Sequence, residues 1–232
     1  MYHSITIGSK NTWDDWRLIP SSRPLVVPPT VKESSLDIPG TNGLLDTTDM
    51  HGRVMYGNRA GSWQFFVEND FRPWEEAYSD IMGYVHGQAR YVVLEDDPEY
   101  YYQGRIKVNQ WASNKDYSSI TFDYNLDPYK YKIAYRNEEW EWNPLNPYGS
   151  AIDYRMIEVP GTKTVTIVGR NEEIVPDIIV SSSMEMTYDG NEYVLTKGHN
   201  RPSDLILTGG QSNTLIFTGY GVVSIDYRGG VL

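Results

Sequence analysis

The 232-residue sequence contains no cysteine, which excludes disulfides and cysteine-based metal sites. No run of residues approaches the ~20 apolar positions that a membrane-spanning helix needs, so membrane insertion is not expected. The amino terminus also lacks the charged and then apolar pattern of a signal peptide. We therefore expect the protein to be made, folded and first used in a cytoplasm.

Basic residues are also scarce. The chain has 20 Lys and Arg against 31 Asp and Glu, for a formal net charge of −11. A protein that grips phosphates needs clustered cations that release counterions on binding. Sequence-specific nucleic-acid binding is therefore disfavoured.

Aromatic residues are abundant, at 13% of the chain, and 19 of them are tyrosines. Tyrosine fits a pleated, half-buried surface, so the composition predicts a mainly β protein. One segment, at about 72–86, instead has helical periodicity. Pro73 suits its first turn and Gly87 its carboxyl-terminal cap. The apolar stripe of this helix is predicted to contain Trp74, Ala77, Tyr78, Ile81, Met82 and Val85.

Strand-like runs at 90–96, 104–112 and 118–125 follow the helix and predict an antiparallel meander. Breaks around Pro144 and Pro147 place a linker at 137–149, between a domain at 1–136 and a domain at 150–232. The second domain has short β-like runs at regular spacing, which is typical of a β-sandwich. Its expected strands include 151–159, 163–169, 203–210, 213–219 and 221–230, with a hairpin turn at Asp189-Gly190.

An acidic cluster is the most conspicuous candidate site. Glu95, Asp96, Asp97 and Glu99 surround Pro98. Paired carboxylates serve glycosidases and hard metal ions, but adjacent acids at a hairpin tip point in different directions. Asp and Pro are also ordinary turn residues, so we interpret the cluster as a turn. Replacing Asp96 and Glu99 is then expected to change stability by no more than ~0.5 kcal/mol each.

After the acidic cluster, Gly104 is expected at a bulge or a close backbone approach, with Arg105 next to it. The histidines at 3, 51, 86 and 199 have no metal-binding spacing, and no nucleophile elbow or phosphate loop is present. Glycines in "TGGQSN" and "TGYGVV" are expected in turns, and "HNRP" at 199–202 in a loop. We predict no catalytic residue, no cofactor and no metal site.

The order of several motifs resembles the distal tail proteins of long-tailed, non-contractile bacteriophages. The motifs run from "GLLDTTD" and "YGNRAGSWQFFVEN" through "VVLEDDPEYYYQGRIKV" and "DPYKY" to "LILTGGQSNTLIFTGYGVVSIDYRGGVL". They cover nearly the whole chain. Within them, Asp97, Pro98, Gly104 and Arg105 form the structural family motif that we take from the resemblance.

This resemblance implies an amino-terminal belt-type β domain with one helix and a β-hairpin, and a carboxyl-terminal galectin-like β-sandwich. It further implies a non-enzymatic virion protein, assembled in the bacterial host cytoplasm, of which six copies form a ring at the distal end of the tail. The implied partners are the tail tube protein, the tail-associated protein and the receptor-binding apparatus, and DNA passes through the ring.

Reasoning from the residues alone leaves two other functions open. A carbohydrate-binding module or adhesin would use the carboxyl-terminal sandwich, and a glycoside hydrolase would use the acids at 95–99. Galectin-type sites stack a sugar on an aromatic ring, usually Trp, and residues 143–232 contain no Trp. Tyrosines such as Tyr188, Tyr193 and Tyr220 could replace it. We predict that the sandwich has no lectin site and serves as a docking or spacer domain.

Overall fold

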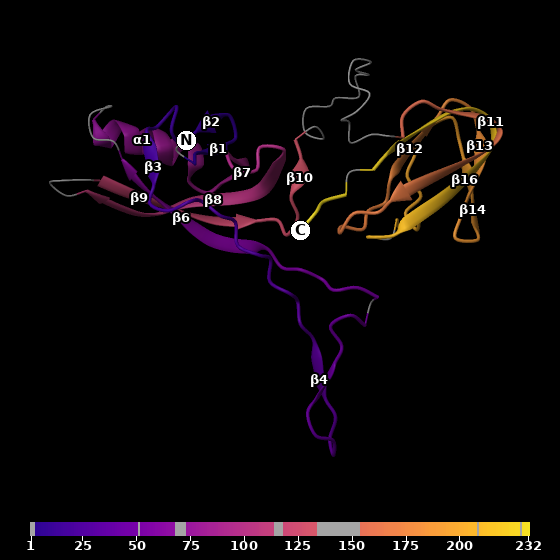
Figure 1. Ribbon diagram of the computed structural model, residues 1–232, viewed down its shortest axis with the longest axis horizontal. Helices are drawn as coiled ribbons and strands as arrows, with labels where there is room; N and C mark the ends of the chain where they lie inside the picture. Colours follow the sequence, from indigo (N-terminus) through magenta and orange to yellow (C-terminus); the bar gives the residue numbers. More distant parts are fainter. Residues whose placement is uncertain are drawn as a thin grey trace. The chain divides into compact units, whose positions relative to one another are not determined.

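The computed structural model describes residues 3–50, 52–67, 73–113, 118–133, 154–207, 209–227 and 229–232. The chain divides into two compact units, residues 1–130 and 131–231. Both units are built mainly from β-strands, as predicted (Figure 1). The linker expected at 137–149 lies outside the described residues.

The first unit contains a large antiparallel sheet. Its strands run in the order β2-β1-β7-β8-β9-β6-β3, so the predicted meander β7-β8-β9 is confirmed at its centre. The strands are β1 (Ile5–Ile7), β2 (Lys10–Asn11), β3 (Leu18–Pro20), β6 (Arg59–Val67), β7 (Gln88–Leu94), β8 (Tyr100–Ser113) and β9 (Ser118–Leu126).

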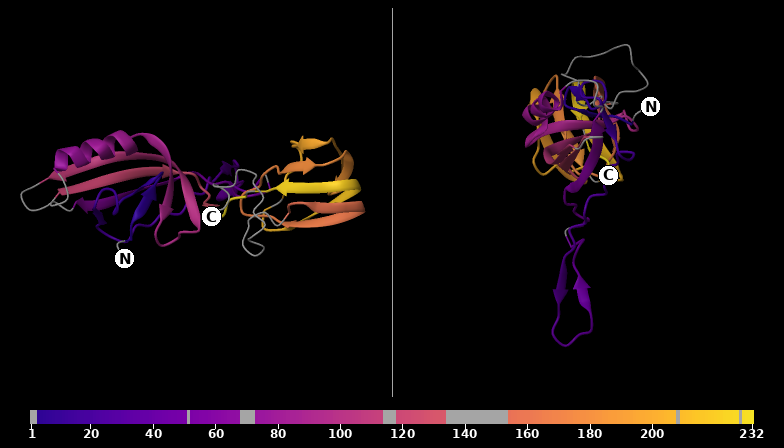
Figure 2. Two further views of the ribbon diagram at one scale, coloured as in Figure 1. Left: turned by 90° about the horizontal axis from the view of Figure 1, so that it is seen from above. Right: turned by 90° about the vertical axis from the view of Figure 1, so that its left-hand side faces the viewer.

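A single helix among the described residues, α1 (Trp74–Val85), packs against β7 and β8 on one face of this sheet (Figure 2). It begins directly after Pro73, and Gly87 follows it in a left-handed conformation (φ 74°), as the sequence predicted. The stripe of Ala77, Ile81 and Val85 is buried. No helix in the described part of the chain is long and apolar enough to cross a membrane.

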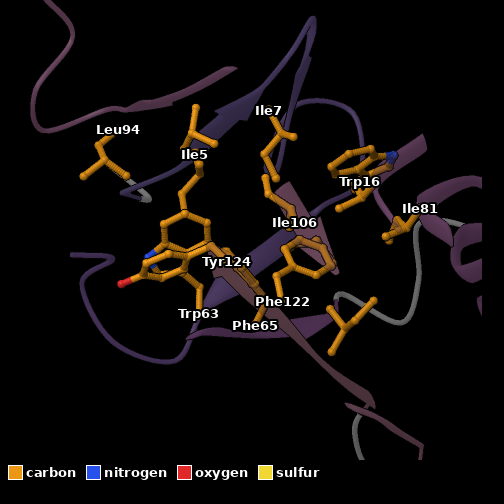
Figure 3. Packing of buried hydrophobic residues seen from close by; sticks show 14 of the residues in the cluster. Ile5, Ile7, Trp16, Trp63, Phe65, Ile81, Leu94, Ile106, Phe122 and Tyr124 are labelled. Atoms are coloured by element: carbon orange, nitrogen blue, oxygen red, sulfur yellow. The ribbon is translucent and has the colours of Figure 1, made fainter. Parts of the chain in front are cut away.

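The core of the first unit is made of buried side chains from α1 and from the strands of the sheet, β1 and β3 included (Figure 3). Alternate residues of β9 supply much of it, because successive side chains of a strand point to opposite faces. Trp63 stacks on Tyr124, with ring centroids 4.1 Å apart. The labelled side chains of Figure 3 are Ile5, Ile7, Trp16, Trp63, Phe65, Ile81, Leu94, Ile106, Phe122 and Tyr124.

Residues 30–50 and 52–57 form a two-stranded ribbon, which carries β4 (Ser35–Asp37) and β5 (Leu44–Asp46) at its far end (Figure 1). Near the sheet, the amide of Gly57 donates to the carbonyl of Thr30 over 2.7 Å. Every residue from 31 to 46 is exposed. The ribbon is therefore the hairpin of the first unit, and no described segment covers its far half.

The second unit contains one sheet in the order β14-β13-β16-β12-β15, with β11 also paired to β16. Buried residues from β11 to β14 and from β16 share one core, so the sheet curls around it. Its strands are β11 (Ile157–Val168), β12 (Asp177–Val180), β13 (Met184–Tyr188), β14 (Asn191–Leu195), β15 (Gly198–Asn200) and β16 (Ser212–Asp226), and the unit begins with the short β10 (Tyr131–Lys132).

Two glycines inside β16 explain how this sheet curls. Along one edge, β16 pairs with β13 up to Thr218 and then with β12 from Val223 onward. Gly219 and Gly221, with φ of 150° and 151°, lie between these two partners. A Cβ on Gly219 would be 2.7 Å from the Cβ of Met184, so only glycine lets the strands approach there.

Several strand predictions for the second unit were wrong. The runs at 213–219 and 221–230 do not give two strands, because the glycines of "TGYGVV" bend a strand instead of ending it, and the single strand β16 runs from Ser212 to Asp226. The runs at 151–159 and 163–169 likewise give the single strand β11, within the described residues from 154 onward. The described residues of the run at 203–210 contain an isolated bridge from Leu207 to Ile174 but no strand, and "HNRP" begins inside β15. The Asp189-Gly190 turn is confirmed, since both residues have positive φ (47° and 76°).

Candidate functional site: an acidic turn beside the root of an exposed ribbon

The acidic cluster forms the turn between β7 and β8, as interpreted from the sequence. The amide of Asp97 donates to the carbonyl of Leu94 over 3.0 Å, and the amide of Tyr100 donates to the carbonyl of Asp97 over 3.2 Å. In the described part of the chain, no group of three or more His, Asp or Glu side chains could hold a metal ion.

The carboxylates of this turn nevertheless have specific partners. Glu95 accepts from the amide and hydroxyl of Ser4, at 2.6 and 3.1 Å. Asp97 accepts from Lys130 Nζ over 2.7 Å. Asp96, between them, binds a third segment. Three consecutive acids therefore bind three segments of the chain that are distant in sequence.

Asp96 is the most enclosed of these acids, with 16% of its side chain exposed. Arg23 donates to it from Nε over 2.8 Å, and His3 donates from Nδ1 over 3.0 Å. A carboxylate only accepts, so the proton of His3 must be on Nδ1. The hydrogen bond from Arg23, together with that from His3, holds the pKa of Asp96 below its usual value against the opposing effect of burial.

Arg23 belongs to the root segment, residues 21–28, which leads from β3 into the ribbon. Buried side chains of β6 and β9 hold this segment against the sheet. The indole Nε1 of Trp63 donates to the carbonyl of Leu25 over 2.9 Å, and the hydroxyl of Tyr124 accepts from the amide of Val27 over 3.1 Å. Burial raises the pKa of Tyr124, so the hydroxyl stays protonated at neutral pH.

Arg59 is a buried cation with carbonyl partners. It donates from Nε to Pro128 over 2.8 Å and from Nη1 to Val27 over 3.0 Å, and burial lowers the pKa of its guanidinium. One side chain therefore fixes both the root segment and the segment after β9. The T-shaped contact of Tyr56 and Tyr129, at 6.3 Å between ring centroids, joins the near end of the ribbon to the segment after β9.

A pocket of about 340 Å³ lies between the root segment and β6, lined by Ser21–Leu25 and Ser62–Gln64. It combines three serine hydroxyls, the Gln64 amide and the Arg23 cation with the apolar surfaces of Pro24, Leu25 and Trp63. Leu25 is 66% exposed at its edge. Such a pocket fits a ligand that is partly apolar and partly anionic.

The far half of the ribbon presents two different faces. Leu36 pairs with Leu45, and Ile38 shares their face because it is two residues beyond Leu36. On the other face, Leu44 pairs with Asp37, and Asp46 is two residues along the strand. Leu44 is 66% exposed and Leu45 51%. The ribbon is thus apolar on one face and has a leucine between two carboxylates on the other.

The structure places the four residues of the expected family motif along the turn and the start of β8. Asp97 and Pro98 are in the turn, whereas Gly104 and Arg105 are in β8. At Gly104 the close approach is confirmed, since a Cβ would meet the carbonyl of Asn125 and lie 2.6 Å from the Cα of Leu126. The bulge lies elsewhere, between Val108 and Gln110. Arg105 donates to the carbonyl of Gly87, so the four do not form one site.

Sequence reasoning missed Arg23, Lys130 and His3 as partners of the acidic turn, because the contacts span 33 to 93 residues. It also missed the exposed leucines of the ribbon. The sequence did contain an indication of these leucines, since "LDIPGTNGLLD" places apolar residues on both sides of a turn. The described histidines 3, 86 and 199 each have a hydrogen-bond partner, and His51 lies outside the described residues.

No protein-family model and no curated protein sequence matches the chain. Among solved structures, the chain is similar to the Dit protein of phage SPP1, which is described as a paradigm of the hub adsorption apparatus in phages that infect Gram-positive bacteria. The TM-score is 0.61 at 13% identity, and the match covers 98% of this chain and 99% of that chain. This likeness confirms the fold expected from the motifs.

Proposed function

We propose that the protein is a structural component of a phage tail tip, in which six copies form a ring through their first units. The ring would join the tail tube to the tail-associated protein and the receptor-binding apparatus. The likeness to SPP1 Dit over 98% of the chain supports this role, and the number six follows from the resemblance to distal tail proteins. No catalytic step is part of the proposal.

The exposed ribbon is the observation that carries the proposal. Large apolar side chains on a surface indicate an interaction site when they are gathered in one place. Eight of them lie at positions 31, 36, 38, 44, 45, 50, 54 and 55 of the ribbon, each at least 37% exposed. An assembly with further copies of the chain would remove these side chains from water.

Acidity supports the same function. Residues 1–136 carry 18 acids against 14 bases, and residues 137–232 carry 13 against 6. A ring through which DNA slides must not bind the DNA, and an acidic protein has little affinity for phosphates.

The second unit is proposed as a galectin-like docking or spacer domain without a sugar site. Of the three tyrosines that could replace a tryptophan platform, Tyr188 and Tyr193 pack against the core. The hydroxyl of Tyr188 is also bound to Asn213 over 2.7 Å. Tyr220 alone is open, at 77% exposure, and a single ring gives one stacking contact.

The ring is tested by negative-stain images and native mass spectrometry of the full chain, alone and with the neighbouring tail proteins. Six copies of the 26.6 kDa chain should give a species of about 160 kDa. A triple variant Leu36→Ser, Leu44→Ser and Leu45→Ser should abolish it. The control Val168→Ser, Val194→Ser and Tyr220→Ser removes similarly exposed apolar groups from the second unit and should leave it intact. Monomers alone, even with the tail proteins present, would contradict the proposal.

A further inference from the structure

The tip of the ribbon, residues 38–43 between β4 and β5, carries a side chain that can react with its own backbone (Figure 1). Asn42 is followed there by Gly43, and no other asparagine in the sequence precedes a glycine. We infer that Asn42 is a covalent modification site, at which spontaneous deamidation adds a carboxylate to the tip. The inference does not depend on the proposed ring.

The reaction needs only water and the groups of this dipeptide. The main-chain nitrogen of Gly43 loses its proton to hydroxide and attacks the side-chain Cγ of Asn42. A new C–N bond closes a cyclic imide, while the side-chain amino group takes a proton back from water and leaves as ammonia. Water then opens the imide at either of its two carbonyls. Position 42 becomes aspartate or isoaspartate, according to which bond is broken.

The tip leaves the attacking nitrogen open. Gly43 has a φ of 82°, and a Cβ built on it would have no atom within 4 Å, so no neighbouring segment shields its nitrogen. In the described part of the chain, the Gly43 amide donates no hydrogen bond and the Asn42 side chain makes none. Both residues are exposed to water. Only three residue pairs of β4 and β5 hold the strands behind the tip, so local opening there costs little free energy.

The fold protects other asparagines from the same reaction. Asn200 donates from Nδ2 to three backbone carbonyls. Asn213 is buried, and it also donates from Nδ2 to the carbonyl of Ile167. Asn125 lies inside β9, which pairs with a strand on each side, and the branched Leu126 follows it. The fold therefore leaves Asn42 as the favoured site.

The product changes both the charge and the backbone of the ribbon. Asp37 and Asp46 are the only charged residues from 35 to 46, and a third carboxylate would take the formal net charge of the chain from −11 to −12. In isoaspartate, the main chain runs through the former side chain and gains one carbon atom. The register of Asp37 with Leu44 depends on the length of this turn, so the longer turn weakens the pairing of β4 with β5.

Peptide mapping tests the inference on the full chain. The tryptic peptide from Glu33 to Arg53 contains Asn42 and no other asparagine or glutamine. After incubation at mildly alkaline pH, mass spectrometry should show first-order conversion of this peptide to aspartate and isoaspartate forms. The intact chain should gain a more acidic species on anion exchange. The tryptic peptide 116–130, whose only asparagine is Asn125, is the internal control and should convert roughly tenfold more slowly or less.

Variants of the tip separate the chemistry from a general loosening of the turn. Asn42→Gln should block conversion, because the longer side chain must close a larger ring. Gly43→Ala should slow conversion, because its Cβ crowds the attacking nitrogen. Gly40→Ala is the matched control, since Gly40 has a similar φ of 88° and equally open surroundings but is not bonded to Asn42. Its rate should equal that of the wild type. The wild-type rate should rise with pH, because the nucleophile is the deprotonated amide.

The role of the fold is measured against the urea-unfolded chain. The folded and unfolded chains should convert at Asn42 with rates within about tenfold of each other, because the folded tip is nearly as open as an unfolded segment. A folded rate below that range would show that the tip shields Asn42 and would overturn the inference. Equal conversion of the peptides 33–53 and 116–130, or equal conversion of Asn42→Gln and the wild type, would also overturn it.

Discussion

Arg23 donates a hydrogen bond from Nε to Asp96 over 2.8 Å and so joins the segment that enters the ribbon to the turn between β7 and β8. The two residues are 73 positions apart in the sequence. Glu99, in the same turn, is exposed and has no such partner among the described residues. The acids of the turn are therefore not equivalent, and their replacements should have different effects.

Asp96→Asn should lower the melting temperature more than Glu99→Gln. The asparagine loses the charge that accepts from both Arg23 and His3, whereas Glu99 should follow the ordinary surface range of about ±0.5 kcal/mol. Thermal unfolding of the two variants beside the wild type measures the difference. Equal melting temperatures for both variants would show that the Asp96 contacts contribute nothing.

The Asp96 contacts should also give an acid-dependent loss of stability. The pKa of Asp96 is lowered in the folded protein, so its contribution is complete above the unfolded value of 3.8. It is lost as the pH falls through the lower folded pKa. The wild type should therefore lose part of its stability advantage over Asp96→Asn below about pH 4. Melting curves of both proteins between about pH 2 and 6 check this, and parallel curves would contradict it.

Gly104→Ala should destabilise the first unit by about 1–3 kcal/mol, because its Cβ would meet the backbone of Asn125 and Leu126. Gly83 is the matched control. It lies on the exposed side of α1, and an added Cβ would have no atom within 4 Å, so Gly83→Ala should stabilise the helix by roughly 0.5–1 kcal/mol. Urea unfolding followed by tryptophan fluorescence reports on the first unit, since all tryptophans precede residue 143.

Arg59→Met should cost roughly 1–3 kcal/mol, since it leaves the carbonyls of Val27 and Pro128 without their donor. Because the same side chain holds the root segment, limited proteolysis should cut this variant near residues 23–28 faster than the wild type. Arg105→Met removes a more exposed arginine, which binds the carbonyl of Gly87, and should leave the cleavage rate at the root unchanged. Equal cleavage of both variants would contradict the role of Arg59.

The full chain should bind galactosides and host wall polysaccharide with a dissociation constant weaker than ~1 mM, or about −4.1 kcal/mol. The reason is that the second unit has no tryptophan among residues 143–232 and only one open tyrosine of the three considered. Isothermal titration measures this. Saturable binding with a dissociation constant below ~1 mM would support a carbohydrate-binding function instead, if the binding disappears in Tyr220→Ala.

By itself, the sequence determined the features that depend on local periodicity and backbone restriction. The alternation of Ile120, Phe122 and Tyr124 predicted β9, because side chains of a strand alternate between faces, and the spacing of Ala77, Ile81 and Val85 predicted α1. Gly104 and the Asp189-Gly190 turn were identified because few residues other than glycine tolerate their surroundings.

Only the tertiary structure decided which distant residues meet. Whether Asp96 is a turn carboxylate without a partner or the partner of Arg23 depends on how β3 and β7 are placed in one sheet. No local sequence pattern contains that information. In the same way, the glycines of "TGYGVV" fit a turn or a bent strand equally well, and the change of partner from β13 to β12 selects the bend. The exposure of Leu44 and the pocket beside Arg23 arise from long-range packing, because burial depends on what the rest of the chain leaves uncovered.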